Sequence, residues 1–403
     1  MTPAFGDRGF LSEHALWVMR FYGEQAIDPS GGLFHYYLDD GRVYDRVQRH
    51  LVSATRFVVT HALAFELSGN PAFRERCAHA LRFVQQAFHD PVTGGYHWTV
   101  HWRNGVAEPQ DCTRHMYGLA FVMLAAARAA QAGVEGALGV LHSTFALAEQ
   151  RFWEPAAQLY ADEATPGWVV SPYRGQNANM HACEALIAAF EATQERRFIE
   201  RAEALAHGIT VRLAAHTGGG IWEHHRADWS PDWDYNRHDR SNIFRPWGYQ
   251  PGHFTEWAKL LCQLDAHLPM PWHMPRATEL FDRAWSTAWD PLHGGMHYGF
   301  APDGSICDPA KYHWVQAETL AAAALLALRT GEARYRQAYH QQWQYCWNHF
   351  VDHQQGAWFR ILTPDNFNLT REKSPAGKVD YHDIGACVDV WRALGAAGPG
   401  ASL

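Results

Sequence analysis

The sequence predicts an all-α fold, an (α/α)6 barrel in which six outer helices surround six inner helices, with short β-hairpins at the end that holds the functional site. Three observations lead to this prediction. A glycine-rich phrase recurs at intervals of roughly 62 residues along the 403-residue chain. Each copy precedes an apolar helical pattern and then an amphipathic one. Neither end of the chain shows the polar cap that an open array of repeats requires, so we expect the repeats to close into a ring.

The recurring phrase combines turn residues with aromatic residues. It reads DPSGGLFHYY from residue 28, DPVTGGYHWTV from 90, DPLHGGMHYGF from 290 and DHQQGAWFRIL from 352, with weaker copies from 154 and 216. Asp-Pro and Gly-Gly pairs favour turns, and alternating aromatic residues favour a short strand. Each copy therefore predicts a strand and turn that lead into a helix.

The segments between the phrases have the period of paired helices. SATRFVVTHALAFELSG, from residue 53, and AETLAAAALLALRTG, from 317, contain few charges and suit inner positions. The second helix of a pair, such as NPAFRERCAHALRFVQQAF from residue 70, is amphipathic and suits an outer position. We expect one domain over residues 1–403, with residues 396–403 as a flexible tail.

One interval is longer, about 75 residues, because it contains an insertion at residues 223–247. The insertion, EHHRADWSPDWDYNRHDRSNIFRPW, is polar, charged and rich in tryptophan. A plain surface loop is one interpretation. We prefer a lid over a polar ligand site, because long loops in compact domains are often functional.

Composition restricts the class of partner. The formal net charge of −8 argues against nucleic acid, because no basic face competes for phosphates. The first residues lack the pattern of a signal peptide, and no apolar run reaches the ~18 residues of a membrane helix. Seven scattered cysteines without a Cys-x-x-Cys pair suit reduced thiols. We expect a cytoplasmic monomer or homodimer without a membrane or nucleic-acid partner.

Polar residues recur where the predicted inner helices begin. Aligning these starts places the following residues at one register: Arg56, His115, His181, His253, Val315 and His382. Glu184, Glu256 and Glu318 follow three positions later, on the same helix face. Parallel inner helices share one end, so we expect these side chains to converge on one cup. A single histidine there is usually a cap or a satisfied core residue, but five cationic or imidazole groups favour a functional site.

The residue types at the cup suit a sugar. Amides, aromatic rings, histidines and carboxylates supply hydrogen bonds to hydroxyl groups and flat faces for C–H groups. Imidazole titrates near neutral pH and can both take and return a proton. Proton transfer between adjacent sugar carbons requires this, because a base removes the proton alpha to a carbonyl and an acid returns it through an enediol.

Other interpretations remain open from the residues alone. A metal site is possible because His and Glu dominate, although no His-Glu-x-x-His motif occurs. A glycosidase would use two carboxylates that flank the scissile bond. A non-catalytic sugar-binding protein is a third class, although it would not need titratable histidines at the floor of the cup. We expect no metal and no cofactor.

Four separated motifs resemble the N-acylglucosamine 2-epimerase superfamily over essentially the whole chain. They are GYQPGHFTEWAKLL, NANMHACEAL, KYHWVQAETLAAAALL and DYHDIGACVDVW. The last is most similar to the aldose–ketose isomerase branch. The resemblance implies an (α/α)6 barrel and metal-independent proton transfer through a cis-enediol. It also implies that His253 and His382 are the acid/base pair, and it leaves open which of them opens the pyranose ring.

The expected reaction is reversible isomerisation of D-mannose, a monosaccharide, to D-fructose. Substrate-binding positions are expected at Arg56, Tyr117, Asn177, His181, Glu184, Glu256, Trp257, Trp314, Gln316 and Glu318. A 2-epimerase acting on an N-acylglucosamine or a cellobiose is the alternative, because epimerases and isomerases share the first step. Sulfoquinovose isomerisation would need a cationic pocket. The insertion mixes four arginines (Arg226, Arg237, Arg240 and Arg245) with aspartates, so it is not clearly an anion site.

Overall fold

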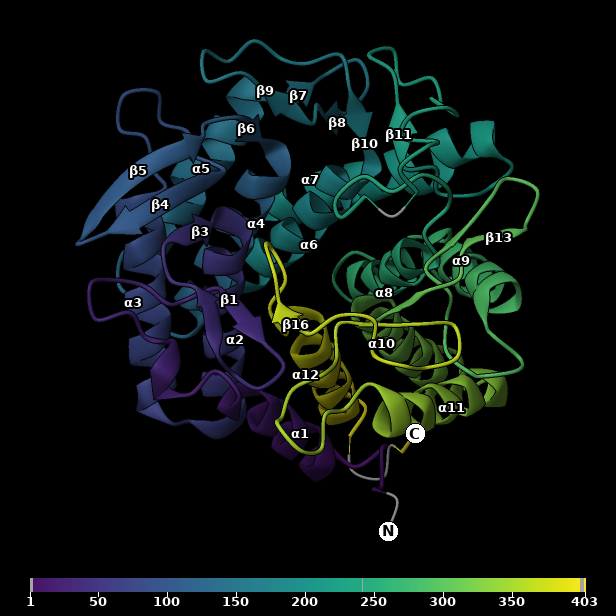
Figure 1. The fold of residues 1–403 in the computed structure, drawn as a ribbon. Coiled ribbons are helices and arrows are strands. Elements are labelled where there is room, and N and C mark those ends of the chain that lie inside the picture. The colour runs from purple at the N-terminus through teal and green to yellow at the C-terminus, as the bar shows by residue number, and fades with distance from the viewer. Residues whose placement is uncertain (1–2, 241, 399–401) are drawn as a thin grey trace.

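Six apolar helices form the inner ring of the structure, a computed structural model that describes residues 3–240, 242–398 and 402–403 (Figure 1). They are α2 (Leu51–Ser68), α4 (Met116–Gln131), α6 (Gln176–Thr193), α8 (Pro251–His267), α10 (His313–Thr330) and α12 (Tyr381–Ala396). The outer ring consists of α1 (Arg8–Arg20), α3 (Pro71–Ala87), α5 (Ala137–Arg151), α7 (Arg196–His207), α9 (His273–Ala288) and α11 (Ala333–His349). This arrangement confirms the predicted (α/α)6 barrel. Residues 399–401 of the expected tail at 396–403 lie outside the described residues.

The two ends of the chain together supply the sixth helix pair. Five inner helices pack against the outer helix that follows them in sequence, as the repeat predicts. The sixth inner helix, α12, packs instead against α1 from the start of the chain. It also contacts α10 on one side and α2 on the other, which closes the ring (Figure 1). The predicted order of inner helix then outer helix is therefore wrong for the last pair.

The sequence pattern explains which helices lie inside. In α10 every residue from His313 to Ala327 is buried, because small and apolar side chains face neighbours on all sides. In α7 the buried residues lie on one face, which is the pattern of a helix with a solvent side. Between α2 and α3, Gly69 ends the first helix in a left-handed conformation with φ of 64°. Asn70 then caps the second, and Pro71 occupies its first turn.

Short antiparallel strands lie at the end of the barrel where the inner helices begin. They are β1 (Tyr36–Leu38), β2 (Val43–Asp45), β3 (Gln48–His50), β4 (Thr99–Arg103), β5 (Val106–Asp111), β6 (Arg114–His115), β7 (Trp153–Glu154), β8 (Leu159–Tyr160), β9 (Glu163–Ala164), β10 (Arg174–Gly175), β11 (His224–His225), β12 (Gly299–Phe300), β13 (Ile306–Asp308), β14 (Lys311–Tyr312), β15 (Ile361–Leu362) and β16 (Glu372–Ser374). Strands β3, β6, β10 and β14 lead directly into α2, α4, α6 and α10. The strands therefore position the first turns of the inner helices.

The recurring phrase makes a tight turn after an outer helix, and its last residues enter a short strand, as predicted; Thr99 begins β4 and Gly299 begins β12. The turn closes with a single β-bridge, such as His89 with Tyr96 or Trp289 with Met296. The second glycine is required by close packing at residue 295. Gly295 has φ of 80°, and a Cβ there would lie 2.4 Å from the ring of Tyr345.

The acidic residue of the phrase makes a buried ion pair that the turn interpretation did not foresee. It contacts a cation in the strand before the next inner helix. The pairs, with N–O distances, are Asp28–Arg49 (2.5 Å), Asp90–Arg114 (2.5 Å), Glu154–Arg174 (2.5 Å), Asp290–Lys311 (2.9 Å) and Asp352–Lys373 (2.7 Å). Five of the six repeats thus connect the end of an outer helix to the entry of the next inner helix.

The described part of the chain contains no helix that is both long enough and apolar enough to cross a membrane.

Replacing Asp290 by Asn tests the repeated ion pair. Burial alone would raise the pKa of Asp290, but hydrogen bonds from Lys311 and from backbone N–H groups lower it to about 2. The variant leaves Lys311 buried without its counter-charge, so we expect the free energy of unfolding at pH 7 to fall by about 3 kcal/mol. Because the carboxylate of the folded wild type has the lower pKa, its contribution is complete above pH ~4 and is lost as the pH falls toward 2. Chemical denaturation over this pH range measures the difference.

The exposed Asp303 provides the matched control, because it accepts hydrogen bonds from Ser305 without contacting a cation in an ion pair. Asp303→Asn should change the free energy of unfolding by about 0.5 kcal/mol or less. Equal effects of the two substitutions would contradict a structural role for the Asp290–Lys311 pair.

Candidate active site

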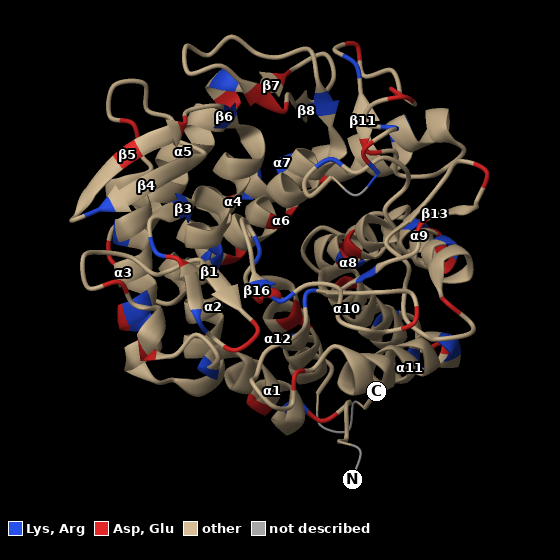
Figure 2. Cartoon of the chain, in the orientation of Figure 1, with Lys and Arg blue, Asp and Glu red and all other residues tan. Residues whose placement is uncertain are grey.

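A cavity opens at the end of the barrel where the inner helices begin, and all six inner helices line it. The lining residues are Arg56, Tyr117, Asn177, His181, Ile243, Phe244, Pro246, His253, Glu256, Tyr298, Trp314, Lys378 and His382. Figure 2 shows charged segments of both signs on α8 and α12, near the centre of the ring. The sequence-derived expectation that polar helix starts converge at one end is therefore met in the geometry.

The polar residues form two levels instead of the one register that the alignment assumed. The deeper level consists of the sixth residue of five inner helices: Arg56, Phe121, His181, Glu256 and Glu318. The upper level consists of second and third residues: Tyr117, Asn177, His253, Trp314 and His382. Helices rise 1.5 Å per residue, so the two levels differ by about 5 Å in depth. The alignment was wrong because it matched histidines by type, whereas the helices begin at different distances from them.

His115 and Val315, which the alignment included, take different positions. His115 is the N-cap residue of α4 and lies 3.6 Å from the Glu163 carboxylate, outside the cavity. Val315 is a fully buried core residue of α10. The residues of α10 that belong to the site are Trp314, one position before Val315, and Glu318, three positions after it.

His382 is held between a carboxylate and a guanidinium. Its Nδ1 lies 2.7 Å from Glu318 Oε1, and its Nε2 lies 3.3 Å from an Arg56 nitrogen. A carboxylate accepts and a guanidinium donates, so Nδ1 carries the proton and Nε2 presents a lone pair. Burial, Arg56 and Lys378 lower the pKa of His382 well below its usual value. The ring is therefore a neutral imidazole, which is the form of a general base.

His253 has a corresponding carboxylate partner. Its Nδ1 lies 2.9 Å from Glu223 Oε1, so Nδ1–H donates to the carboxylate and Nε2 is the nitrogen left to act. Gln176 donates from Nε2 to Glu223 Oε2 at 2.9 Å. The orientation of this amide is fixed because Gln176 Oε1 accepts from Trp257 Nε1, also at 2.9 Å. Together these contacts fix the position of the ring; the Glu223 carboxylate favours the proton on Nδ1, while Gln176 Nε2 lies 3.0 Å from the same nitrogen.

The floor of the cavity contains a carboxyl group with unused hydrogen-bonding capacity. Among the described residues, neither oxygen of Glu256 has a hydrogen-bond partner, although the side chain is buried. Burial and the neighbouring Glu318 raise the pKa of Glu256 well above its usual value. A protonated carboxyl can both donate to and accept from a hydroxyl group. Glu256 is thus suited to bind a polyhydroxylated ligand.

Arg56 brings a positively charged guanidinium to the cavity wall. Its guanidinium donates to Gly377 O at 2.6 Å and packs between the rings of Phe121 and Tyr381, 4.6 and 4.7 Å from their centroids. Aromatic faces on both sides hold the planar group in one orientation. Arg56 can therefore donate hydrogen bonds into the cavity without large rearrangement.

Four residues that we expected to contact a substrate do not line the cavity: Glu184, Trp257, Gln316 and Glu318. Glu184 accepts hydrogen bonds from Tyr381 and His181, and Gln316 binds both backbone groups of Met296 at 2.8 Å. Trp257 and Glu318 contact Gln176 and His382 from behind. These side chains support the wall instead of forming its surface.

Several residues near the cavity escaped the sequence analysis. Glu223, Tyr298 and Lys378 lie outside the inner helices, where no helical period identifies them. Burial and the nearby cations Arg56 and Arg360 lower the pKa of Lys378 well below its usual value. Lys259 did have a signal, because it is a single charge within the apolar run FTEWAKLL of an inner helix.

The insertion at residues 223–247 covers the cavity. Ile243, Phe244 and Pro246 line it, and the ring of Phe244 lies 5.7 Å from the ring centroids of both His50 and Trp98. Arg245 fixes this segment by ion pairs to Glu163 at 2.6 Å and Asp162 at 3.1 Å. Ile243, Phe244 and Pro246 thus form part of the cavity wall.

Among the described residues, three groups of side chains have the geometry to hold a metal ion, with ligand atoms within 4.8 Å of one another. They are His115–Asp162–Glu163, His181–Glu184–Glu256 and Glu256–Glu318–His382. Each group contains a carboxylate that already contacts a charged or hydrogen-bonding side chain: Arg245, His181 and Lys259, respectively. Protein groups can thus neutralise these carboxylates.

Comparison with known proteins agrees with this geometry. A family model described as N-acylglucosamine 2-epimerase (GlcNAc 2-epimerase) matches residues 32–386, and the chain belongs to this family. D-mannose isomerase of Marinomonas mediterranea is 47% identical over 394 residues, which cover 97% of this chain and 99% of that protein. A crystal structure of D-mannose isomerase matches with a TM-score of 0.95 and 47% identity, covering 98% of this chain and 100% of that chain.

A more distant relative shares the same barrel. The structure of cellobiose 2-epimerase from Spirochaeta thermophila matches with a TM-score of 0.84 and 25% identity, covering 96% of each chain. The matches confirm the family that the four sequence motifs resemble. The similarity to the isomerase is greater than the similarity to this epimerase.

The protonation state of Glu256 gives a test based on pH. Because its pKa is raised in the folded state, its contribution to stability is complete below the unfolded pKa and is lost as the pH rises through the folded pKa. Glu256→Gln removes this dependence. We expect the free energy of unfolding of wild type, relative to that variant, to fall with pH at up to about 1.4 kcal/mol per unit above pH ~4.3. Denaturant titrations between pH 5 and pH 8 measure the slope.

Glu75→Gln is the matched control, because Glu75 is exposed on α3. Its stability difference from wild type should not change over the same pH range. If Glu256→Gln behaved in the same way, Glu256 would be ionised throughout.

Proposed function

We propose that the protein is an aldose–ketose isomerase that interconverts D-mannose and D-fructose. The observation that carries this proposal is the pair of buried histidines on one cavity, each with Nδ1 bound to a carboxylate: His253 to Glu223 and His382 to Glu318. The ring of Trp314 lies between them in reach of both, 5.0 Å from the His253 centroid and 5.8 Å from that of His382. The name of the 47%-identical relative supports mannose as the substrate.

The reaction begins with opening of the pyranose ring. One histidine moves a proton from the O1 hydroxyl toward the ring oxygen, so the C1–O5 bond breaks and an aldehyde forms. A neutral imidazole then removes the C2 proton, and the electron pair forms the C1–C2 double bond while the aldehyde oxygen gains a proton. The imidazolium returns a proton to C1 as O2 loses one, which gives the ketose. Over the cycle the C2 proton moves to C1 and the O2 proton moves to O1, so protons balance.

The carboxylate partners of the histidines assist both halves of this cycle. Imidazolium forms next to Glu223 or Glu318, and the negative charge stabilises it. The Nδ1–H bond remains in place, so the acting Nε2 keeps its position. The same histidine can therefore act first as a base and then as an acid.

Arg56 is suited to stabilise the intermediate. Negative charge develops on the O1 and O2 oxygens when the C2 proton leaves, and fixed donors are most effective at such positions. The guanidinium lies beside His382 and is held by Gly377 and two aromatic rings. Lys378 lies on the same side of the cavity, where its amino group can donate a hydrogen bond. These groups replace the Lewis acid that some sugar isomerisations use.

The insertion is proposed to act as a lid during the reaction. An enediol exposed to water would exchange protons or decompose, so the site must exclude solvent. Phe244 covers the cavity, and Arg245 is in position to hold the closed state through Glu163.

The product of the reaction distinguishes the proposed activity from its alternatives. The protein is treated with EDTA and incubated with D-mannose in heavy water, and the sugars are separated by chromatography. We expect fructose, with deuterium at C1 only to the extent that the imidazolium exchanges its proton with solvent before returning it. No ketose, or complete dependence on added metal, would contradict the proposed mechanism. Early glucose in place of fructose would indicate a 2-epimerase, which returns the proton to C2 from the opposite face.

Variants of the two histidines test their roles in the same assay. His253→Ala and His382→Ala should each reduce kcat by about 10²–10⁴-fold, the range expected for general acid/base catalysis. His216→Ala, at an exposed position, is the control and should retain full activity. Circular dichroism verifies that each variant is folded. Activity close to wild type in either cavity variant would remove that histidine from the acid/base pair.

A further inference from the structure

A lysine lies behind the cavity floor, inside the apolar core of the barrel. Lys259 is the ninth residue of α8 and follows the fully buried Trp257 and Ala258. Only 4% of its surface is exposed, so its charge requires partners within the protein. Its Nζ lies 2.6 Å from Glu318 Oε2 on α10 and 3.7 Å from Asp389 Oδ2 on α12. Lys259 does not line the cavity.

Glu318 connects this lysine to the catalytic histidine. One carboxylate oxygen, Oε2, contacts Lys259, and the other, Oε1, lies 2.7 Å from His382 Nδ1. The ammonium is therefore one carboxylate away from the imidazole. An interaction of this kind fixes the orientation and charge of the carboxylate on which the histidine tautomer depends.

We propose that Lys259 is a positioning residue for the isomerisation: it keeps Glu318 ionised, so that Glu318 holds His382 in the Nδ1–H tautomer with Nε2 facing the substrate. This inference rests on the proposed function, because it assigns a role within that reaction. A neutral Glu318 could instead donate a proton to Nδ1. The lone pair would then face Glu318, and Nε2 would carry the proton and could not act as the base.

The electrostatic surroundings agree with this role. Burial raises the pKa of Glu318 to about 7, and Lys259 opposes the rise while Glu184 and Asp389 add to it. Burial alone would lower the pKa of Lys259, but Glu318 and Asp389 raise it, assisted by Glu256 and Glu184. Without the ammonium, four carboxyl groups from four helices would face one another in the core.

The basic groups around the histidine favour its neutral form. Arg56, Lys378, His313 and His181 face His382 and lower its pKa together with burial. These groups keep His382 neutral but do not select which nitrogen holds the proton. Arg56 favours a lone pair on Nε2, and Glu318 favours a proton on Nδ1. Lys259 therefore strengthens the constraint that Glu318 imposes, which is the proton on Nδ1.

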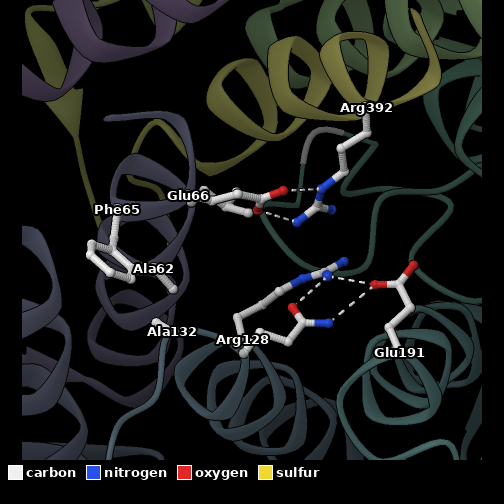
Figure 3. Close-up of a pocket in the computed structure, with 9 residues that line it drawn as sticks. Ala62, Phe65, Glu66, Arg128, Ala132, Glu191 and Arg392 are labelled. Carbon is white, nitrogen blue, oxygen red and sulfur yellow. Dashed lines mark hydrogen bonds and ion pairs between the residues drawn. The ribbon is translucent and has the colours of Figure 1, made fainter. Parts of the chain in front are cut away.

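Below Lys259 the charges continue to the opposite end of the barrel. Asp389 Oδ1 lies 3.8 Å from Arg392 NH1, and Arg392 makes two hydrogen bonds to Glu66, at 2.8 and 2.5 Å. Figure 3 shows this last pair at a pocket on that end, next to a second pair between Arg128 and Glu191. Because these charges are paired with one another, the pocket itself offers no evident ligand site. Asp389 and Arg392 complete the electrostatic environment of Lys259 from below.

The test uses Lys259→Met and Lys259→Gln in the full-length chain. Glutamine can still donate a hydrogen bond to Glu318 but carries no charge, so it separates charge from packing. We expect each variant to reduce kcat by about 10–100-fold with little change in KM. The pH profile of kcat should also change, because Glu318 then titrates at higher pH. Unchanged kcat and pH profile in Lys259→Gln would overturn the inference, while a wild type that makes fructose would leave the proposed function standing.

Nitrogen NMR of histidine-labelled protein gives a readout that does not require activity. The wild-type signal of His382, assigned by its loss in His382→Ala, should be that of a neutral ring with the proton on Nδ1. In Lys259→Gln the signal should shift toward the Nε2–H tautomer, and Lys259→Arg should restore the wild-type pattern. A wild-type tautomer in Lys259→Gln would contradict the proposal even if catalysis were absent from every variant.

Two further variants separate positioning from general destabilisation. Glu318→Gln combined with Lys259→Met should be no slower than Glu318→Gln alone, because the lysine acts through that carboxylate. Asp389→Asn breaks the charged contacts on the side of Lys259 away from Glu318. It should change kcat by about 3-fold or less. Additive losses in the double variant, or an equal loss in Asp389→Asn, would indicate a structural role only.

Discussion

All six inner helices run in the same direction, so their first turns meet at one end of the barrel. Every feature of the site depends on this constraint. It gathers residues that are up to 326 positions apart in sequence, such as Arg56 and His382, within hydrogen-bond distance. It also requires each inner helix to enter the ring at a defined depth. The repeated ion pairs, such as Asp290–Lys311, help fix that depth because in five of the six repeats they connect the end of an outer helix to the strand before the next inner helix.

The same constraint creates an electrostatic difficulty, since carboxyl groups from neighbouring helices are brought together in the core. The structure resolves it differently at each position. Glu318 is compensated by Lys259, and Glu184 by hydrogen bonds from His181 and Tyr381. Among the described residues, neither oxygen of Glu256 accepts a hydrogen bond, and burial together with Glu318 raises its pKa well above the usual value. Two carboxylates thus bind the histidines from behind, and the Glu256 carboxyl lies against the substrate space.

Sequence patterns were sufficient to predict the barrel and the end that holds the site. Helical period and turn chemistry are local properties, and six repeats of them leave few ways to close a ring. The depth of each residue was not predictable in the same way. His181 and His253 look equivalent in an alignment, but one is the sixth and the other the third residue of its helix, because α6 begins at Gln176 and α8 at Pro251.

Partners across the barrel were also beyond local patterns. Glu223 lies in the insertion, 30 residues before His253, and no period connects the two. Trp257 and Gln316 were expected to contact a sugar because of their side-chain chemistry, but their hydrogen bonds are directed to Gln176 and Met296. Whether a polar side chain faces a cavity or a neighbour depends on the helix face and on what packs there, which only the three-dimensional arrangement defines.

A crystal structure with D-mannitol would test the central claim most directly. This polyol has the open chain of the substrate without the carbonyl, so it can bind but cannot react. If His253 and His382 transfer the proton, one Nε2 should lie about 3–3.5 Å from C1 and C2, with the other near O5. Binding with C1 and C2 away from both imidazoles, for example directed only at Glu256, would contradict the account.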